Sequence, residues 1–407
     1  MDITNHVIDL PPVLGSFTRT RVVILVTGRT AVAPIGGMAS VARHVATARR
    51  LGFDPIVLYP ARMRALGAEI AGEIEDDAVC LPSDVLAEQA GDDADLALTI
   101  AADWYVSPAA IVAFNDHTSG PAVARFDDRG RTVAPVARMS VGAVRSMIPK
   151  LDGSPTAELI HHAVDRDATV VPLLASERHR LSDNVAISRC EDKLFASLGD
   201  IDEPWHVHAM HKYAAIPLTR RLAHTRFTPF QLATLKIALG LLAAAVLAGG
   251  GYLRGLGGAF LAITSRLLDA VSGDLARAAV RDGAQNERFD LIGDLLVQTT
   301  ILWAVAVRLA TPTATWLAII GTVGIAISAW VSYRRVFRRV WEAQKRNARH
   351  DVRRDNYGSR FARRNGPAYG LVLAALLGRL DLFLWAAAIT CHLFYLGWLV
   401  SERHPSR

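Results

Sequence analysis

The spacing of apolar residues changes character a little past the middle of the chain. Before that point, short β-branched runs at residues 21–26 and 55–59 flank a stretch with helical periodicity at residues 39–51. Strand, helix and strand in that order predict a βαβ unit and hence a parallel sheet. Further strands are expected at residues 96–100 and 169–173. This part of the chain therefore favours an α/β fold.

From Phe230 onward, long apolar runs dominate the sequence. There are six of them, at residues 232–247, 255–268, 291–309, 315–331, 368–377 and 382–400. A bilayer core needs roughly 20 apolar residues in a helix, and the second and fifth runs reach that length only with their polar neighbours. A soluble helical bundle is the alternative, but it needs polar helix faces that these segments lack.

These patterns divide the chain into four parts. We expect a tail over residues 1–20, a cytosolic α/β domain over 21–200, a linker with a juxtamembrane helix over 201–228, and an all-α domain of six transmembrane helices over 229–402. The first residues lack a basic segment followed by an apolar core, so no signal peptide is expected there.

Basic residues predict the orientation of the spans. The connection between the fourth and fifth runs, residues 334–364, holds twelve arginines and lysines against three acidic residues. The positive-inside rule places this connection, and both chain termini, in the cytoplasm. Anionic lipid is its expected partner, rather than nucleic acid. We therefore expect a multi-pass protein of the inner (cytoplasmic) membrane.

Composition supports this class. Hydrophobic residues make up 51% of the chain and charged residues 21%, which is more apolar than a typical soluble enzyme and excludes a disordered chain. The three cysteines have neither disulfide-scaffold nor metal-ligand spacing. We interpret His206, His208 and His211 as solvent-facing residues of an extended linker rather than zinc ligands, because only Asp202 and Glu203 lie nearby to orient them.

Carboxylates interrupt the apolar pattern between the second and third runs. On helices, Asp269 and Gly273 share one face, and Asp290 and Asp294 share another. Antiparallel helices would bring these carboxylates together at the membrane edge, where ionised groups normally mark function. Clustered carboxylates need a cation, and oxygen ligands favour Mg²⁺, Mn²⁺ or Ca²⁺. Arg277 adds a guanidinium suited to phosphate, so the set predicts phosphate chemistry.

These charges have two other possible roles. The aspartates could be structural, as caps or as partners of the arginines at positions 266, 277, 281 and 288. A transporter would place its intramembrane charges near the midplane of broken helices, whereas these lie at the expected cytosolic ends.

The segment resembles the signature of the CDP-alcohol phosphotransferase family, D-x-x-D-G-x-x-A-R-x8-G-x3-D-x3-D. Six of its eight positions are present, namely Asp269, Gly273, Ala276, Arg277, Asp290 and Asp294. Ser272 stands at the second aspartate and Asn286 at the second glycine. Thr228 and Pro229 match the family's T-P-N motif before the first span, with Phe230 in place of the asparagine.

The resemblance implies a membrane phosphotransferase of phospholipid or polar-lipid biosynthesis. Such enzymes move a phosphoalcohol group from a CDP-alcohol to an acceptor alcohol and release CMP, with two divalent metal ions (Mg²⁺ or Mn²⁺) and commonly as homodimers. By position, the resemblance implies that the metal ligands are Asp269, Asp290 and Asp294. The residues that border the nucleotide would be Gly273, Ala276, Arg277, Thr228 and Pro229. Asp294 would also be the general base.

The departure at Ser272 opens an alternative. A hydroxyl is a poor and neutral ligand, so the site loses one carboxylate. Asp274 is the candidate replacement, although a helix turns it about 200° away from Ser272. Either Ser272 or Asp274 therefore completes the metal site, or the chain is a catalytically degenerate membrane protein that binds or scaffolds.

Residues 21–200 resemble, more weakly, the nucleotidyltransferase fold. Gly36 and Gly37 stand where that fold has a glycine-containing helix start, and Asp103 stands where it has a metal-binding aspartate. The fusion resembles the bifunctional inositol-phosphate cytidylyltransferase/di-inositol-phosphate-phosphate synthase. The usual G-x-G-x-R loop is absent, so a structural or substrate-docking role is the alternative. Asp103 could equally cap a helix that starts at Pro108.

Overall fold

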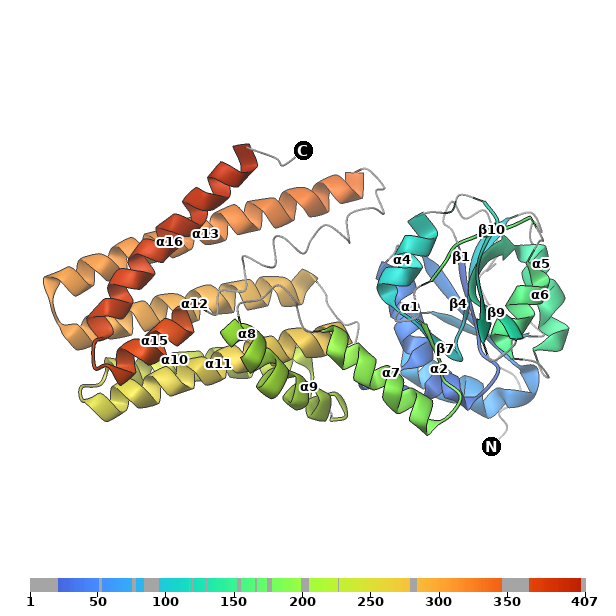
Figure 1. Cartoon of the computed structure of the whole chain (residues 1–407), viewed down its shortest axis with the longest axis horizontal. Helices are drawn as coiled ribbons and strands as arrows, with labels where there is room; N and C mark the ends of the chain where they lie inside the picture. Colours follow the sequence, from blue (N-terminus) through green and yellow to red (C-terminus); the bar gives the residue numbers. More distant parts are fainter. Residues whose placement is uncertain are drawn as a thin grey trace, which may run out of the picture. The chain divides into compact units, whose positions relative to one another are not determined.

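The computed structural model shows two compact units, residues 1–194 and 195–407 (Figure 1). The structure describes residues 21–50, 53–74, 78–83, 95–116, 118, 120–128, 131–151, 155–164, 167–173, 178–198, 205–225, 227–278, 284–345 and 366–403. The predicted tail and most of the basic connection lie outside these residues. The boundary between the units falls inside helix α7 (Asn184–Ser197).

A seven-stranded mixed sheet forms the centre of the first unit. Its strands are β1 (Arg21–Leu25), β4 (Asp54–Tyr59), β5 (Val79–Pro82), β6 (Leu96–Ala101), β8 (Ala122–Asp128), β9 (Arg131–Ser140) and β10 (Thr169–Val170). Their order across the sheet is β10-β8-β9-β6-β1-β4-β5. β1 pairs in parallel with β4 and β6, whereas β9 is antiparallel to both of its neighbours.

The predicted βαβ unit is confirmed, and the prediction of a parallel sheet is confirmed around β1. It is wrong at β9, because the consecutive strands β8 and β9 pair with each other in antiparallel register. The strand expected at residues 169–173 is shorter than predicted, since it spans Thr169–Val170 and its contact with β8 ends with one hydrogen bond from the Val171 N–H to the Val123 carbonyl.

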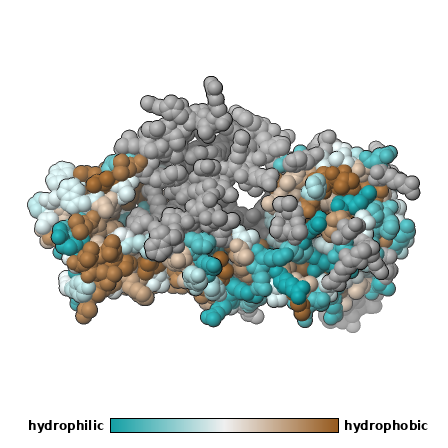
Figure 2. Space-filling view, in the orientation of Figure 1, coloured by the Kyte–Doolittle hydropathy of each residue, from teal (hydrophilic) through white to brown (hydrophobic). Residues whose placement is uncertain are grey.

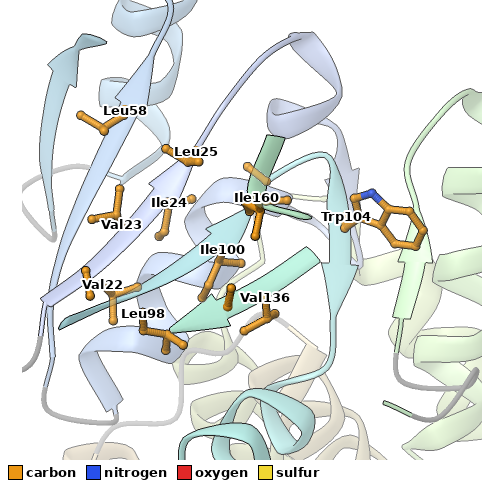
Figure 3. Close-up of a cluster of buried hydrophobic side chains, with 14 of the residues drawn as sticks. Val22, Val23, Ile24, Leu25, Leu58, Leu98, Ile100, Trp104, Val136 and Ile160 are labelled. Atoms are coloured by element: carbon orange, nitrogen blue, oxygen red, sulfur yellow. The ribbon is translucent and has the colours of Figure 1, made fainter. Parts of the chain in front are cut away.

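Helices pack on the sheet and bury its apolar side chains. The α-helices of this unit other than α7 are α1 (Ser40–Arg50), α2 (Arg64–Ile74), α4 (Pro108–Asp116), α5 (Val141–Met147) and α6 (Thr156–Ala163). Figure 3 shows Ile24, Ile100 and Val136 in the core with Ile160 of α6. Strands covered on both faces have continuous apolar runs, which explains the pattern at residues 21–26.

Shorter elements complete the first unit. A short hairpin joins β2 (Pro34–Ile35) to β3 (Met38–Ala39), and β7 (Trp104–Val106) pairs in antiparallel register with the distant strand β11 (Arg178–Arg180). The 3₁₀-helices are η1 (Arg29–Val32), η2 (Ala61–Met63) and η3 (Ile148–Lys150).

The second unit is helical in the part that the structure describes. Its elements are α8 (Trp205–Met210), a π-helical turn η4 (His211–Ala215), α9 (Ile216–Ala223), α10 (Pro229–Ala248), α11 (Tyr252–Ala278), α12 (Ala284–Leu309), α13 (Pro312–Lys345), α15 (Gly366–Leu376) and α16 (Leu380–Arg403). α10 packs along α11 and α12, and α13 packs against α12 and α16 (Figure 1). The histidine-containing linker is helical, so the expectation of an extended segment there is wrong.

Three of these helices are long and apolar enough to cross a membrane. They are Pro229–Ala248, Phe289–Leu309 and Pro312–Trp330, and Leu380–Leu393 is a shorter apolar helix. Large apolar side chains such as Phe260 and Trp316 are exposed, and Figure 2 shows apolar surface gathered over this unit. α15 has only 11 residues. The membrane character is thus supported, and the six-span arrangement stays a prediction.

Glycines allow the helices of this unit to approach closely. A Cβ added at Gly240 of α10 would lie 2.5 Å from Val297 Cγ1 of α12, and one at Gly293 would lie 2.3 Å from Ile237 Cδ1. Side chains at these two positions would force α10 and α12 apart. The separation of the two helices in turn decides which polar side chains can meet between them.

Candidate functional site

Three aspartates from two helices converge on one lysine. Lys236 Nζ of α10 contacts Asp269 Oδ1 of α11, and it lies 3.0 Å from Asp290 Oδ1 and 3.4 Å from Asp294 Oδ1 of α12. We call these four residues the aspartate–lysine cluster. The predicted meeting of the carboxylates thus takes place, and the cation that they share is an ammonium.

Lys236 is the buried member of the cluster. Its side chain is 3% exposed, whereas those of the three aspartates are 30–38% exposed. The hydroxyl of Ser265 donates a hydrogen bond of 2.7 Å to the backbone carbonyl of Lys236, which fixes α10 against α11 at this level. A buried ammonium is stable only when anions surround it, so the aspartates and the lysine hold each other in place.

Arg266 adds a second positive charge beside the cluster. Its guanidinium lies 3.4 Å from Asp294 Oδ1 and 3.8 Å from Asp269 Oδ2. Three carboxylates and two cations give this group a net charge of −1 when all are ionised. The alternative in which the aspartates pair with arginines is therefore present at position 266, and Lys236 is an additional partner.

Ser272 and Gly273 lie on α11 beside the cluster. Ser272 is buried, and its hydroxyl donates a hydrogen bond of 2.9 Å to the backbone carbonyl of Asp269. It therefore serves the helix backbone in this structure. A Cβ added at Gly273 would meet nothing within 4 Å, so open space adjoins the helix there. This space leaves room for a ligand next to Asp269.

Asp274 and Arg277 form a separate group. Asp274 is fully buried, contacts Arg277, and lies 2.7 Å from His211 Nε2 of the π-helical turn. Its contacts are thus with a histidine and an arginine rather than with the aspartate–lysine cluster. Neither the Ser272 hydroxyl nor the Asp274 carboxylate joins the cluster as a fourth oxygen ligand, and the Arg277 guanidinium contacts Asp274.

The predicted nucleotide-binding residues near α10 occupy the start of that helix. Thr228 and Gln231 form a capping box, in which each side chain accepts a hydrogen bond from the other residue's backbone N–H. Pro229 is the first helical residue, and Phe230 packs on Phe289 of α12 with 4.9 Å between ring centroids. Ala276 is buried on α11. The capping box and the Phe230–Phe289 contact fix the start of α10 beside α12. They therefore help to place Lys236 at the level of the aspartates on the neighbouring helices.

The donor set of the cluster does not form a metal centre as it stands. Within the described residues, no group of three or more histidine, cysteine or acidic side chains is arranged to hold a metal ion. The ammonium of Lys236 lies in the position that a metal ion shared by the carboxylates would take. Asp290 Oδ1 is buried and, apart from its ion pair with Lys236 at 3.0 Å, has no hydrogen-bond partner within the described part of the chain.

Sequence reasoning missed the role of Lys236, although a signal was available. A single lysine within an otherwise apolar helix is costly unless a carboxylate pairs with it. The neighbouring helices carry several aspartates, so the lone charge was a sufficient reason to expect an ion pair. It gives no indication of which aspartates are the partners.

In the first unit, Gly36 and Gly37 form the turn between β2 and β3. Their φ angles are +58° and +78°, which is the left-handed region that glycine adopts without strain. The Gly36 N–H donates a buried hydrogen bond of 2.8 Å to Glu191 Oε1. Helix α1 starts three residues later, at Ser40. The expected glycine-containing helix start is therefore wrong, because these residues close a hairpin and the donor of Gly36 is already used.

Asp103 lies at the carboxyl end of β6, beside the end of β1. Burial raises the pKa of Asp103, although hydrogen bonding to Thr156 opposes the shift. Its Oδ1 is buried without a hydrogen-bond partner among the described residues. Thr27, just after β1, shares a hydrogen bond of 2.9 Å with Thr156. Ligands of open α/β sheets bind at such carboxyl ends, so this is a second candidate site.

The capping role considered for Asp103 belongs to another residue. The N–H of Ala110 donates a hydrogen bond of 3.1 Å to Ser107 Oγ, which caps the helix that starts at Pro108. Asp103 is therefore left without that structural role.

Comparison with known protein families and curated proteins found no match: no family model matches the chain, and no curated protein matches its sequence. The two candidate sites therefore have to be interpreted from their own chemistry.

Proposed function

We propose that the chain transfers a phosphoalcohol group from a CDP-alcohol to an acceptor alcohol at the inner membrane and releases CMP. The observation that carries this proposal is the convergence of Asp269, Asp290 and Asp294 on a single cation beside the open space at Gly273. Carboxylates and cations at the edge of apolar helices are costly to maintain, which favours a functional role. The spacing of the aspartates supports the phosphotransferase signature.

In the proposed reaction, the acceptor hydroxyl attacks the β-phosphorus of the donor. A P–O bond forms to the acceptor oxygen, the bond to the CMP oxygen breaks, and CMP leaves as the anion. Asp294, which is partly exposed, takes the hydroxyl proton. Lys236 and Arg266 offer positive charge to the phosphate oxygens. Holding donor and acceptor in line contributes more than the strength of this weak base.

The proposal takes Mg²⁺ or Mn²⁺ from the resemblance alone, as an ion that would enter with the CDP-alcohol rather than bind the cluster of the substrate-free protein. The cluster as described does not present a metal centre, so no step of the reaction is assigned to a metal ion. The chain's own residues supply the charge and the proton acceptor. Dimerisation is likewise proposed from the resemblance alone.

Release of CMP is the direct test. Purified full-length protein in detergent would be offered a panel of CDP-alcohols, including CDP-diacylglycerol and CDP-polyols, with acceptor alcohols and with Mg²⁺, Mn²⁺ or EDTA. We expect CMP with at least one donor, and loss of nearly all turnover in Asp290→Asn and Asp294→Asn. Asp381→Asn is the matched control, because Asp381 pairs with Arg379 on α16. Unchanged turnover in both cluster variants would refute the proposal.

A binding or scaffolding role is the second candidate. It is favoured by the contacts of Asp274 and Arg277 with each other, which occupy the guanidinium assigned to the nucleotide. A binding protein would take up a CDP-alcohol in isothermal titration without releasing CMP. Turnover by the wild type, lost in the cluster variants, would exclude this role.

For the first unit, we propose a nucleotide-binding role centred on Asp103. The proposal rests on its buried, unpartnered Oδ1 at the carboxyl end of β6. Cytidylyltransferase activity and docking of a substrate are both compatible with this position. Formation of a CDP-alcohol from CTP and a phosphoalcohol, abolished by Asp103→Asn, would support the first. Binding of CTP without product formation would support the second.

A further inference from the structure

The most unusual feature of the cluster is that its cation is part of the chain. Lys236 comes from α10, which carries none of the three aspartates, and its ammonium reaches between the carboxylates of α11 and α12. The surrounding residues of α10 are mostly apolar, and Lys236 is one of the most buried charged residues among those that the structure describes. An ammonium there satisfies the carboxylates without any ion from solution.

Carboxylates from two helices surround Nζ. Oxygens of three different carboxylates face it, and Asp290 Oδ1, at 3.0 Å, is buried and accepts no hydrogen bond within the described residues. The ammonium of Lys236 is therefore the cation that balances this oxygen. Oxygen-only, carboxylate-rich surroundings are those in which Mg²⁺ and Mn²⁺ bind in proteins.

We propose that Lys236 is a tethered cation that excludes divalent metal ions from the cluster, and that its removal converts the three aspartates into a divalent-cation site. An ammonium and a divalent ion cannot share the position that all three carboxylates face, because like charges at contact distance repel strongly. In the protein without substrate, the lysine therefore holds this position. The inference rests on the proposed function in one respect, namely that the aspartate–lysine cluster is the functional site.

Binding of Mn²⁺ alone, without a CDP-alcohol, tests the proposal. Free Mn²⁺ would be counted by electron paramagnetic resonance in titrations of full-length wild type, Lys236→Met and the control Lys212→Met. Lys212 lies on the π-helical turn, where its ammonium is 5.5 Å from the ring centroid of Tyr213. We expect Lys236→Met to bind one Mn²⁺ at least about tenfold tighter than wild type, because a unit positive charge has left the site. Lys212→Met should behave as wild type.

A further variant assigns the new site to the aspartates. Adding Asp290→Asn to Lys236→Met removes the carboxylate whose Oδ1 is least satisfied, and the gain in Mn²⁺ affinity should largely disappear. The proposal is overturned if wild type binds Mn²⁺ as tightly as Lys236→Met, or if the gain survives in the double variant.

Lys236→Met leaves three carboxylates with only Arg266 beside them, so the variant could fail to fold. Lys236→Met/Asp294→Asn removes one charge of each sign and keeps the net charge of the wild type. Its melting temperature should rise with Mn²⁺ more than that of wild type. Equal shifts would overturn the proposal. None of these measurements depends on CMP release. The Mn²⁺ result can therefore be interpreted even if the proposed phosphotransferase activity is not found.

Discussion

His211 Nε2 lies 2.7 Å from Asp274 Oδ2, with the histidine side chain 5% exposed and the aspartate fully buried. The contact joins the π-helical turn to α11, and Arg277 contacts the other carboxylate oxygen of Asp274. One aspartate therefore connects the segment before the apolar helices to the helix that carries Asp269.

Removal of this aspartate should destabilise the second unit. Asp274→Ala leaves His211 and Arg277 without their shared buried anion, and breaking such a pair typically costs about 3 kcal/mol or more. Asp274→Asn keeps the shape and one acceptor oxygen, so its cost should be smaller. Asp381→Asn, in an exposed pair with Arg379, should leave the free energy of unfolding close to that of the wild type, because solvent screens such a pair. Chemical unfolding in mixed micelles gives these values.

A methyl group at Gly240 should disturb the packing of α10 on α12. The added Cβ would lie 2.5 Å and 2.6 Å from the two methyl groups of Val297, a side chain with little rotamer freedom. Overpacking of this kind costs about 1–3 kcal/mol, so Gly240→Ala should lower the melting temperature and weaken CMP release. In Gly257→Ala the new Cβ meets only Val246 at 3.9 Å, so that control should retain the stability of the wild type.

His44 should make the first unit sensitive to acid. Burial lowers the pKa of His44 to about 4 from 6.5, although its hydrogen bond to the Trp104 carbonyl opposes the shift. Between these values the unfolded chain binds a proton that the folded chain does not. The free energy of unfolding should therefore fall as the pH drops from about 6.5 to about 4, by at most roughly 3 kcal/mol.

His44→Gln provides the comparison for this pH dependence. Glutamine can keep a donor for the Trp104 carbonyl, which lies 2.9 Å from the imidazole Nε2, but it does not titrate. Burial raises the pKa of Asp103, so protonation of Asp103 on acidification increases the free energy of unfolding, opposite to the effect of His44. This contribution is the same in the wild type and in His44→Gln, so it cancels in the comparison. Identical slopes of unfolding free energy against pH would contradict the prediction.

Cys190 should be unreactive while the first unit is folded. Burial is the main cause that raises the pKa of the Cys190 thiol to about 12, and the side chain packs with Tyr105 and Leu181. Since the thiolate is the reactive form, alkylation at pH 8 should be very slow until the unit unfolds. A variant with Cys80→Ser and Cys391→Ser isolates this thiol, and rapid labelling by iodoacetamide without denaturant would contradict the prediction.

Local patterns accounted for much of the first unit. The strand at 21–26, the helix at 39–51 and the strand at 55–59 were predicted because consecutive buried strands and an amphipathic helix have periodicities that are visible within a few residues. The antiparallel strand β9 was not predicted. Its partners β6 and β8 are fixed by packing across the sheet, and its sequence shows no apolar alternation that reveals its direction.

For the second unit, the sequence by itself determined the apolar helices and the faces on which the aspartates stand. The spacing of Asp290 and Asp294 follows from the helical repeat, so it needs no tertiary information. Only the tertiary structure decided that Lys236 lies between the carboxylates and that Asp274 turns to His211. The physical reason is that contacts between helices depend on how closely and at what level the helices pack. Close approach at Gly240 and Gly293 sets that level, far along the chain from Asp269.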